Sequence, residues 1–331
     1  MNILVISLPY WITFFSLMLV SCFLNQALAR NNHDAHYKMA IIAEPHYFEL
    51  SNLIEEKLYQ SPHYKPRIMR FEPNPIQAQH QLKAFKQNFD LVLAIGPQAL
   101  EYLSEFKPFS DELPVVSILT RPVLLPDAHP MNHSNLIQLN LDQPLYRQLN
   151  LIQTLCLQSR CVGSIGIALG PTSKMYRKEL ETLAENTTLP INIIEINPQF
   201  HPVETMHHLL KESMMLLTIP DESILNSRTV RGLLLSSYHN KTPLIGYSKT
   251  YVNHGALAAV YTSETQLVDE TSRLIVETLK LPRPFPSQSL YTKDFSIAIN
   301  PQVAKLMGFS LKTEIEIKKH MLRLENNKNG K

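Results

Sequence analysis

Asp221 and Glu222 are adjacent carboxylates and the first candidates for acid–base chemistry in this chain. Paired carboxyl groups act as acid and base when their environments separate their pKa values. Neighbouring residues in an extended segment point apart, however, and Asp221 precedes a predicted helix that it can cap. The chain has no GxSxG, HExxH, CxxC, GxGxxG or GxxxxGK[ST] motif. The sequence therefore predicts no enzyme, no cofactor and no metal site, and turnover by Asp221 or Glu222 is the weakest alternative.

Polar side chains in several loops suit the binding of a small solute better. Arg121 can pair with a carboxylate, and Asp221 or Glu222 can hold an ammonium group. Tyr47 and Tyr247 can stack on an apolar or aromatic molecule. These loops supply further predicted ligand contacts, which are Glu44, His46, Thr120, Ser223 and Ser248. For each side chain the alternative is an ordinary role in a turn or a helix cap.

Two predicted helix starts offer unpaired backbone N–H groups to an anion. One begins at Gly96, Pro97 and Gln98, and the other follows Gly170 at residues 171–173. The second start comprises Pro171, Thr172 and Ser173, of which the last two also carry hydroxyl groups. Helix amino termini have a partial positive charge, so both starts favour a carboxylate.

Short apolar strands must position these loops. Residues 216–219, 243–246 and 256–261 are apolar without alternation, which indicates a sheet that is buried on both faces, as parallel sheets are. Ligands of such sheets bind at the carboxyl ends of the strands. The polar loops at 220–223 and 247–255 follow two of these strands, and residues 227–238 between them have helical periodicity.

The same strand–helix alternation runs through the rest of the chain. Further strands are predicted at 38–43, 67–71, 90–95, 114–119, 164–169 and 191–196, with helices at 48–59, 75–88, 97–106, 143–155, 174–185, 203–213 and 263–279. Residues 124–135 lack periodicity, and 137–139 are interpreted as a crossover between domains. The pattern predicts an α/β protein with two doubly wound parallel-sheet domains joined by a hinge. Residues 37–138 with part of 256–311 form the first domain, 139–255 the second, and 312–331 a charged tail.

The amino-terminal segment is apolar and has the features of an export signal. Residues 1–29 contain no Lys, Arg, Asp or Glu, and Ala27, Leu28 and Ala29 fit a small-x-small cleavage site. Two alternatives remain open: a lipobox at residues 19–22 that lipidates Cys22, or an uncleaved membrane anchor. All three place the bulk of the chain outside the cytoplasm, in the periplasm.

Composition and cysteine usage agree with an exported binding protein. The 331 residues carry a net charge of +2, which argues against a nucleic-acid partner. Only 9 glycines are present, which also argues against a glycine-rich phosphate-binding loop. Cys156 and Cys161 form either a local disulfide, which an oxidising compartment permits, or two buried thiols.

Several blocks of sequence resemble a known family. The blocks PDESILNS at 220–227, PLIGYS at 243–248, VNHGALAAVY at 252–261 and DFSIAINPQVAKLMGFSL at 294–311 are similar to ABC-type solute-binding proteins of the type I periplasmic fold. Within that family they look closest to the tryptophan/tyrosine-type branch, and the resemblance spans about 38–311. Two blocks depart from the family pattern. Pro97 and Gln98 replace a small hydroxyl residue, and Arg121 replaces an aspartate, which favours a different or more anionic solute.

The resemblance implies a monomeric protein that closes on a small molecule, an amino acid or related organic anion, and delivers it to an ABC permease. Hinge closure would couple capture of the solute to docking on the permease subunits. The alternative with the same fold is an accessory or sensory lipoprotein that serves a membrane receptor or an outer-membrane transporter.

Overall fold

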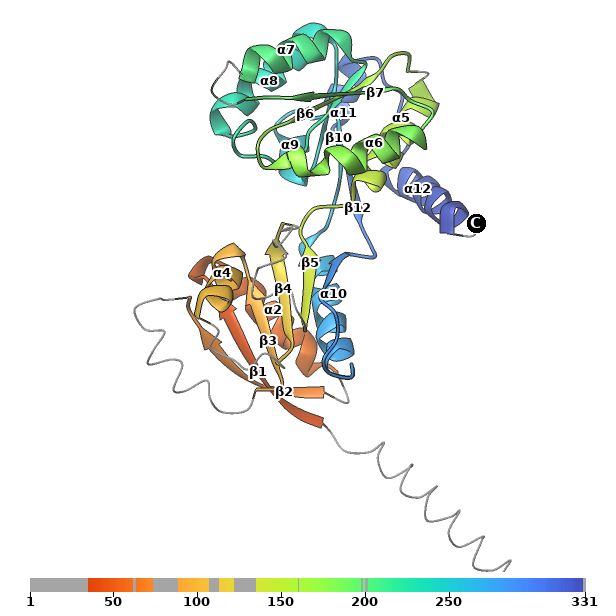
Figure 1. The fold of residues 1–331 in the computed structure, drawn as a ribbon. Coiled ribbons are helices and arrows are strands. Elements are labelled where there is room, and N and C mark those ends of the chain that lie inside the picture. The colour runs from red at the N-terminus through yellow and green to blue at the C-terminus, as the bar shows by residue number, and fades with distance from the viewer. Residues whose placement is uncertain are drawn as a thin grey trace, which may run out of the picture.

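The chain folds into two α/β units, each built around its own six-stranded sheet (Figure 1). The computed structural model describes residues 35–61, 64–73, 89–106, 113–121, 135–159, 161–197, 199 and 202–329. The leader with Cys22, the helix predicted at 75–88 and nearly all of the loop at 124–135 lie outside the described residues. The predicted fold class, two parallel α/β domains, is confirmed.

The first sheet has the strand order β11-β5-β4-β3-β1-β2, and all of its neighbouring strands are parallel. Its strands are β1 (Ala35–Ala43), β2 (Tyr64–Phe71), β3 (Leu91–Ile95), β4 (Val115–Thr120), β5 (Leu136–Asn140) and β11 (Gln288–Tyr291). Residues 137–139 are therefore part of a sheet strand, and the crossover between units follows them.

Both faces of the first sheet are buried. Met39 and Ile41 of β1 pack into one apolar cluster with α2 (Phe48–Tyr59) and α10 (Glu264–Thr278), which lie side by side. Ala40 and Ile42 point to the other face, toward α4 (Pro97–Phe106). Side chains alternate across a strand, so an unbroken apolar run supplies both cores.

The second sheet has the order β12-β10-β9-β8-β6-β7. Its strands are β6 (Ile165–Leu169), β7 (Ile191–Glu195), β8 (Met215–Leu217), β9 (Leu244–Gly246), β10 (Ala258–Tyr261) and β12 (Ser296–Ile299). The edge strand β12 runs antiparallel to β10, whereas the other pairs are parallel.

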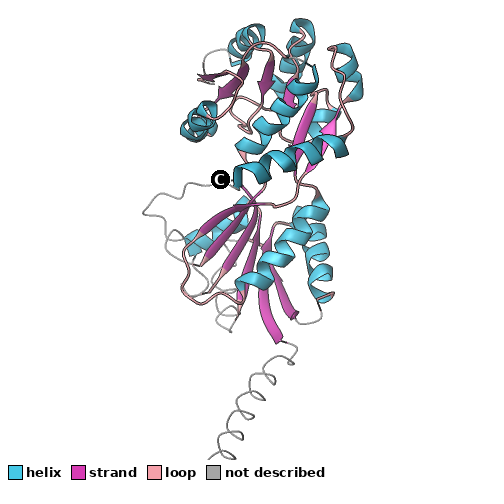
Figure 2. Ribbon diagram, turned by 90° about the vertical axis from the view of Figure 1, so that its right-hand side faces the viewer, coloured by secondary structure: helices cyan, strands magenta, loops and turns pink. Residues whose placement is uncertain are grey.

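Helices cover both faces of the second sheet (Figure 2). They are α5 (Leu145–Ser159), η3 (Ser173–Tyr176), α6 (Arg177–Glu185), α7 (Pro202–Glu212), α8 (Ser227–Asn240), α9 (Lys249–Asn253), α11 (Pro301–Leu306) and α12 (Glu314–Asn329), and the 3-10 turn η1 (Pro45–Tyr47) completes the first unit. Helix α9 occupies a segment predicted to be an irregular loop. Asn226, not Asp221, caps α8, because its side chain accepts the N–H groups of Arg228 and Thr229.

The division between units differs from the predicted boundaries. Residues 256–311 serve both sheets: α10 and β11 complete the first, while β10, β12 and α11 belong to the second. The second unit therefore extends beyond residue 255. Residues 312–331 are not simply a charged tail either, because Ile317 and Met321 of α12 are fully buried in the core of the second unit. In the described part of the chain, no helix is both long and apolar enough to cross a bilayer.

Candidate ligand-binding site

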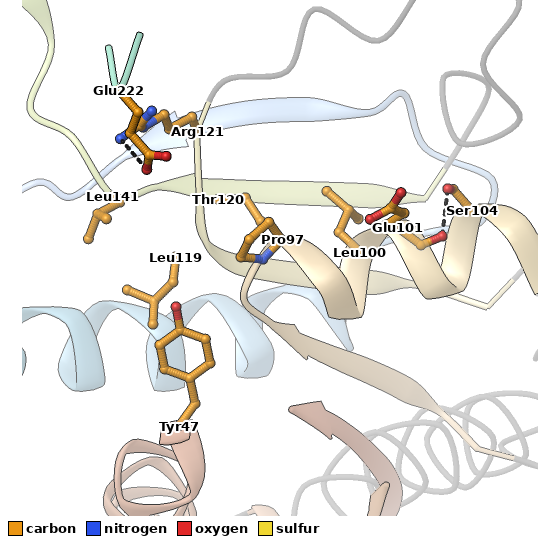
Figure 3. A pocket seen from close by; sticks show the side chains of 10 residues that line it. All are labelled: Tyr47, Pro97, Leu100, Glu101, Ser104, Leu119, Thr120, Arg121, Leu141 and Glu222. Carbon is orange, nitrogen blue, oxygen red and sulfur yellow. Dashed lines mark hydrogen bonds and ion pairs between the residues drawn. The ribbon is translucent and has the colours of Figure 1, made fainter. Parts of the chain in front are cut away.

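A cavity of about 480 Å³ opens where the two units face each other (Figure 3). It lies at the carboxyl ends of the first sheet's strands, where parallel sheets bind ligands. Its lining residues are Tyr47, Pro97, Leu100, Glu101, Ser104, Leu119, Thr120, Arg121, Leu141 and Glu222. A cavity of this size suits a small organic molecule.

Arg121 and Glu222 meet across this cavity. Their closest atoms, Nη2 and Oε1, are 3.9 Å apart, and the two residues come from different units. Gln138 of β5 donates its amide N–H to the Arg121 carbonyl and to Thr120 Oγ1, which fixes the backbone that carries the guanidinium. The Glu222 side chain is 87% exposed, so its ion pair with Arg121 is weak.

Tyr47 reaches the cavity because Gly96 has no side chain. Gly96 has φ +94°, and a Cβ there would lie 2.5 Å from Tyr47 Cε2. Burial and the nearby Glu44 carboxylate raise the pKa of Tyr47, so its hydroxyl stays protonated near neutral pH. Glu44 is buried, and its Oε2 lies 3.6 Å from Nδ1 of the exposed His46. Neither residue is among those that line the cavity. Gln98 is exposed on α4.

Asp221 has a different role from the predicted one. Its buried carboxylate accepts hydrogen bonds from the Thr172 N–H at 3.1 Å and the Ser173 N–H at 2.8 Å. It also accepts the hydroxyl groups of Ser173 and Ser223 and the Ser223 N–H. Burial alone would raise the pKa of Asp221, but the hydrogen bonds from Ser223 and Ser173 outweigh it and lower that pKa.

We call Asp221 with its hydrogen-bond donors Thr172, Ser173 and Ser223 the Asp221 clamp. It bears on two expectations for the second unit. The helix start at 171–173 does not offer free N–H groups to an anion, because Asp221 already accepts them. Both Asp221 oxygens accept hydrogen bonds within the second unit, and a contact of Asp221 with a ligand ammonium stays a prediction. Gly170 permits this arrangement, since a Cβ there would lie 2.7 Å from Asp221 Oδ2. Pro171 and Thr172 are exposed beside it.

Tyr247 and Ser248 follow β9 at the same edge of the second sheet. Ser248 Oγ accepts the Tyr251 N–H at 3.3 Å, so this hydroxyl caps α9. The Tyr247 ring packs against the Tyr251 ring with centroids 4.6 Å apart. Burial raises the pKa of Tyr247, and the charge of Arg121 opposes that rise.

Asp142 is a charged group at the cleft that the sequence prediction omitted. It follows β5, directly after the cavity-lining Leu141. Burial raises its pKa, and Arg121 opposes that rise. Burial raises the pKa values of Tyr176 and Tyr291, and the Asp142 charge adds to both rises. The carboxyl-end rule would have found it had residues 137–139 been recognised as a sheet strand.

The chain passes between the units three times, and one hydrogen-bond network joins the crossing segments. Gln143 Nε2 donates to Thr262 Oγ1 at 2.7 Å and to Thr292 Oγ1 at 2.9 Å, and the two threonines are 2.9 Å apart. Arg147 donates to Gln143 Oε1 and to the Thr292 carbonyl. The three crossing segments are thus held together at one point.

The second unit also contains a disulfide. Cys156 at the end of α5 is joined to Cys161, with their Cα atoms 4.9 Å apart. Among the described residues, no group of three or more His, Cys, Asp or Glu side chains is arranged to hold a metal.

Known structures share this architecture. The ABC domain in complex with L-Trp from Streptococcus pneumoniae is 20% identical, with a TM-score of 0.53 over 86% of this chain and 98% of that one. A ligand-free, open substrate binding protein with adhesive properties from Clostridium difficile is 15% identical, with a TM-score of 0.64 over 84% and 96%. A conserved domain protein from Vibrio cholerae is 17% identical, with a TM-score of 0.52 over 86% and 98%. At these identities the likeness shows the fold.

The family is established by sequence. A comparison with curated proteins finds no match. The family model for ABC transporter substrate binding proteins, however, matches residues 69–321, which is most of the chain and covers parts of both units. Its members bind solutes for ABC transport and are not enzymes. This chain therefore belongs to the ABC transporter substrate-binding protein family.

Proposed function

We propose that this protein captures an amino acid or a related organic anion in the interdomain cavity and delivers it to an ABC permease. The observation that carries the proposal is Arg121 at the cavity wall, opposed by a largely exposed carboxylate from the other unit. A ligand carboxylate would replace Glu222 and pair bidentately with the guanidinium. Leu100, Leu119 and Tyr47 provide the apolar surface for the rest of the molecule.

Closure about the crossing segments completes the site. The second unit contributes Tyr247 and Glu222 at the facing edge. Bringing them over a bound solute would exclude water and create the closed form that docks on the permease as a monomer. Export by residues 1–29, or anchoring through Cys22, would place this cycle in the periplasm.

The proposal is tested by native mass spectrometry of residues 30–331 prepared gently from a periplasmic extract. We expect a bound small molecule that is lost on unfolding. Arg121→Gln should weaken rebinding of that molecule by roughly tenfold or more, since hydrogen bonds between charged groups are lost. Arg231→Gln, on the exposed face of α8, is the matched control and should bind normally.

An empty protein that also shows no thermal shift with a broad panel of metabolites would contradict solute capture. It would favour the accessory or sensory role instead. Equal binding by Arg121→Gln and Arg231→Gln would leave solute capture standing but remove Arg121 from it.

A further inference from the structure

Asp294 joins the two units beside the hinge. It follows the third crossing segment, and its Oδ2 accepts the side-chain N–H of Gln266 at 2.8 Å. Its Oδ1 lies 2.6 Å from Nζ of Lys318 on α12. Ser296 Oγ, at the start of β12, also donates to Gln266 Oε1 at 3.2 Å. We call these contacts of Asp294, Gln266, Ser296 and Lys318 the hinge latch.

The partners of Asp294 are fixed in different units. Gln266 moves with the first unit, because its side chain accepts the Ser263 N–H at the start of α10 and its neighbour Leu267 is buried in the first core. Lys318 moves with the second unit, because its neighbour Ile317 is fully buried in the second core. The Asp294 carboxylate can therefore keep both partners only over a narrow range of orientations of the two units.

The hinge latch and the cavity lie on opposite sides of the hinge. Figure 1 shows α10 and α12 on one side of the molecule and α4, which lines the cavity, on the other. The network of Gln143, Thr262 and Thr292 holds the crossing segments together and is the natural pivot. When a hinged body closes on one side of its pivot, it opens on the other. Closure of the cleft would therefore pull Gln266 away from Asp294.

The hinge latch is formed while the cleft is open. Of the described residues that line the cavity, Glu222 alone comes from the second unit, and its side chain is 87% exposed. A contact that exists in the open form and breaks on closure lowers the free energy of the open form only. Such a contact weakens the apparent affinity for a solute, because binding must populate the closed form.

We propose that the hinge latch holds the unliganded protein open and thereby sets its affinity for the solute. This inference rests on the proposed solute capture and adds a control of that site by residues that do not line the cavity. A stronger latch favours release of the solute, and a weaker latch favours its retention. Through Lys318, the carboxyl-terminal helix α12 takes part in this control.

Asp294→Ala removes the hinge latch. Calorimetry with the molecule that co-purifies with residues 30–331 should show binding that is roughly two- to fivefold tighter than in the wild type, because partly exposed ion pairs contribute no more than that. Damage to the fold would weaken binding instead. Asp269→Ala is the matched control, because its carboxylate also lies 2.6 Å from a lysine, Lys57, but both residues belong to the first unit. It should bind as the wild type does.

A second measurement needs no solute. A spin label on Gln98→Cys, at the exposed start of α4, broadens the NMR signals of amides in α9 when the cleft closes, and its steep distance dependence makes rare closed molecules visible. The label is selective, because the two native cysteines of residues 30–331 form a disulfide. We expect stronger broadening at 249–253 in Asp294→Ala than in the wild type or in Asp269→Ala.

The two measurements separate the hinge latch from solute capture. Unchanged or weaker binding by Asp294→Ala, or equal broadening in the two variants, overturns the latch and leaves solute capture intact. A protein that retains no molecule and shows no thermal shift with amino acids or carboxylic acids fails the proposed function, and the control of affinity with it. In that case, increased broadening in Asp294→Ala still supports a latch that holds the units apart, and equal broadening rejects it.

Discussion

Arg147 and Glu325 form a two-pronged ion pair that ties the carboxyl-terminal helix to the hinge. Arg147 Nε lies 2.8 Å from Glu325 Oε1, and Nη2 lies 3.0 Å from Oε2. The same guanidinium donates to Gln143 and to the Thr292 carbonyl, and it lies 4.5 Å from the centre of the Phe295 ring. One side chain therefore connects α12 to two of the three crossing segments.

Removing the charge of Glu325 should destabilise the second unit. Glu325→Gln leaves the buried Arg147 without a counter-charge, and loss of one partner of a buried pair costs about 3–5 kcal/mol. We expect a decrease toward the lower end of that range in the free energy of unfolding in urea, since Glu325 is only partly buried. Lys319→Gln, exposed on the same helix, is the control. Equal losses in the two variants would contradict a specific role of the pair.

Gly170 should tolerate no side chain. In Gly170→Ala the Cβ would lie 2.7 Å from Asp221 Oδ2 and 2.8 Å from Ser223 Oγ, so the clamp must shift at a cost of about 1–3 kcal/mol. Gly232→Ala is the matched change in the interior of α8, where the nearest atom is 3.6 Å away. It should stabilise the protein by about 0.5–1 kcal/mol through helix propensity. Thermal unfolding of the two variants should thus move in opposite directions.

The Asp221 clamp should make the free energy of unfolding depend on pH in the acidic range. Hydrogen bonds from Ser223 and Ser173 lower the pKa of Asp221 in the folded protein against the opposing effect of burial. The folded state then holds this proton less tightly than the unfolded chain. The contribution of Asp221 to the free energy of unfolding is therefore complete above the ordinary aspartate pKa. It is lost as the pH falls through the lower pKa that Asp221 has in the folded protein.

Asp221→Asn reveals that contribution. We expect it to lower stability at neutral pH by about 3 kcal/mol, since hydrogen bonds to a charged group contribute about 1.5–3 kcal/mol each and the amide keeps only some of them. Urea unfolding between neutral and acidic pH should show the difference from the wild type shrinking on acidification. A difference that is independent of pH would mean that the charge does not matter.

The disulfide should be present in protein recovered from an oxidising compartment. Alkylation without reduction should leave Cys156 and Cys161 unmodified. Alkylation after reduction should increase the mass of the protein by two alkyl groups. Changing both residues to Ser opens a short loop and should cost about 2 kcal/mol by chain entropy. Two alkyl groups added before reduction would show that the thiols are free.

The local spacing of apolar residues predicted most of the helices and strands, but it did not predict which strands pair with each other. The helix at 48–59 has the predicted bounds, because the spacing of Leu50, Ile54 and Leu58 determines it alone. The assignments of β5 and β12 to their sheets were missed because strand pairing depends on residues far away in the chain. Periodicity carries no information about such pairing.

The same distinction applies to the site. The loops at strand ends were found by the carboxyl-end rule, and five of the predicted residues line the cavity, namely Tyr47, Pro97, Thr120, Arg121 and Glu222. Their roles in ligand binding stay predictions. The use of Asp221 by Thr172 and Ser173 was not predictable, because these partners are separated by 48 residues or more and meet only in the folded sheet.

The interleaving of the two units sets an order of events during synthesis. The first core needs α10 and β11, and the second needs β12, α11 and α12, so both wait for residues beyond 263. A nascent chain that ends earlier exposes apolar surface on both sheets, which invites aggregation or chaperone binding. Termination before β11 is synthesised should therefore yield no half-protein with one finished unit, only a chain that quality control can recognise and remove.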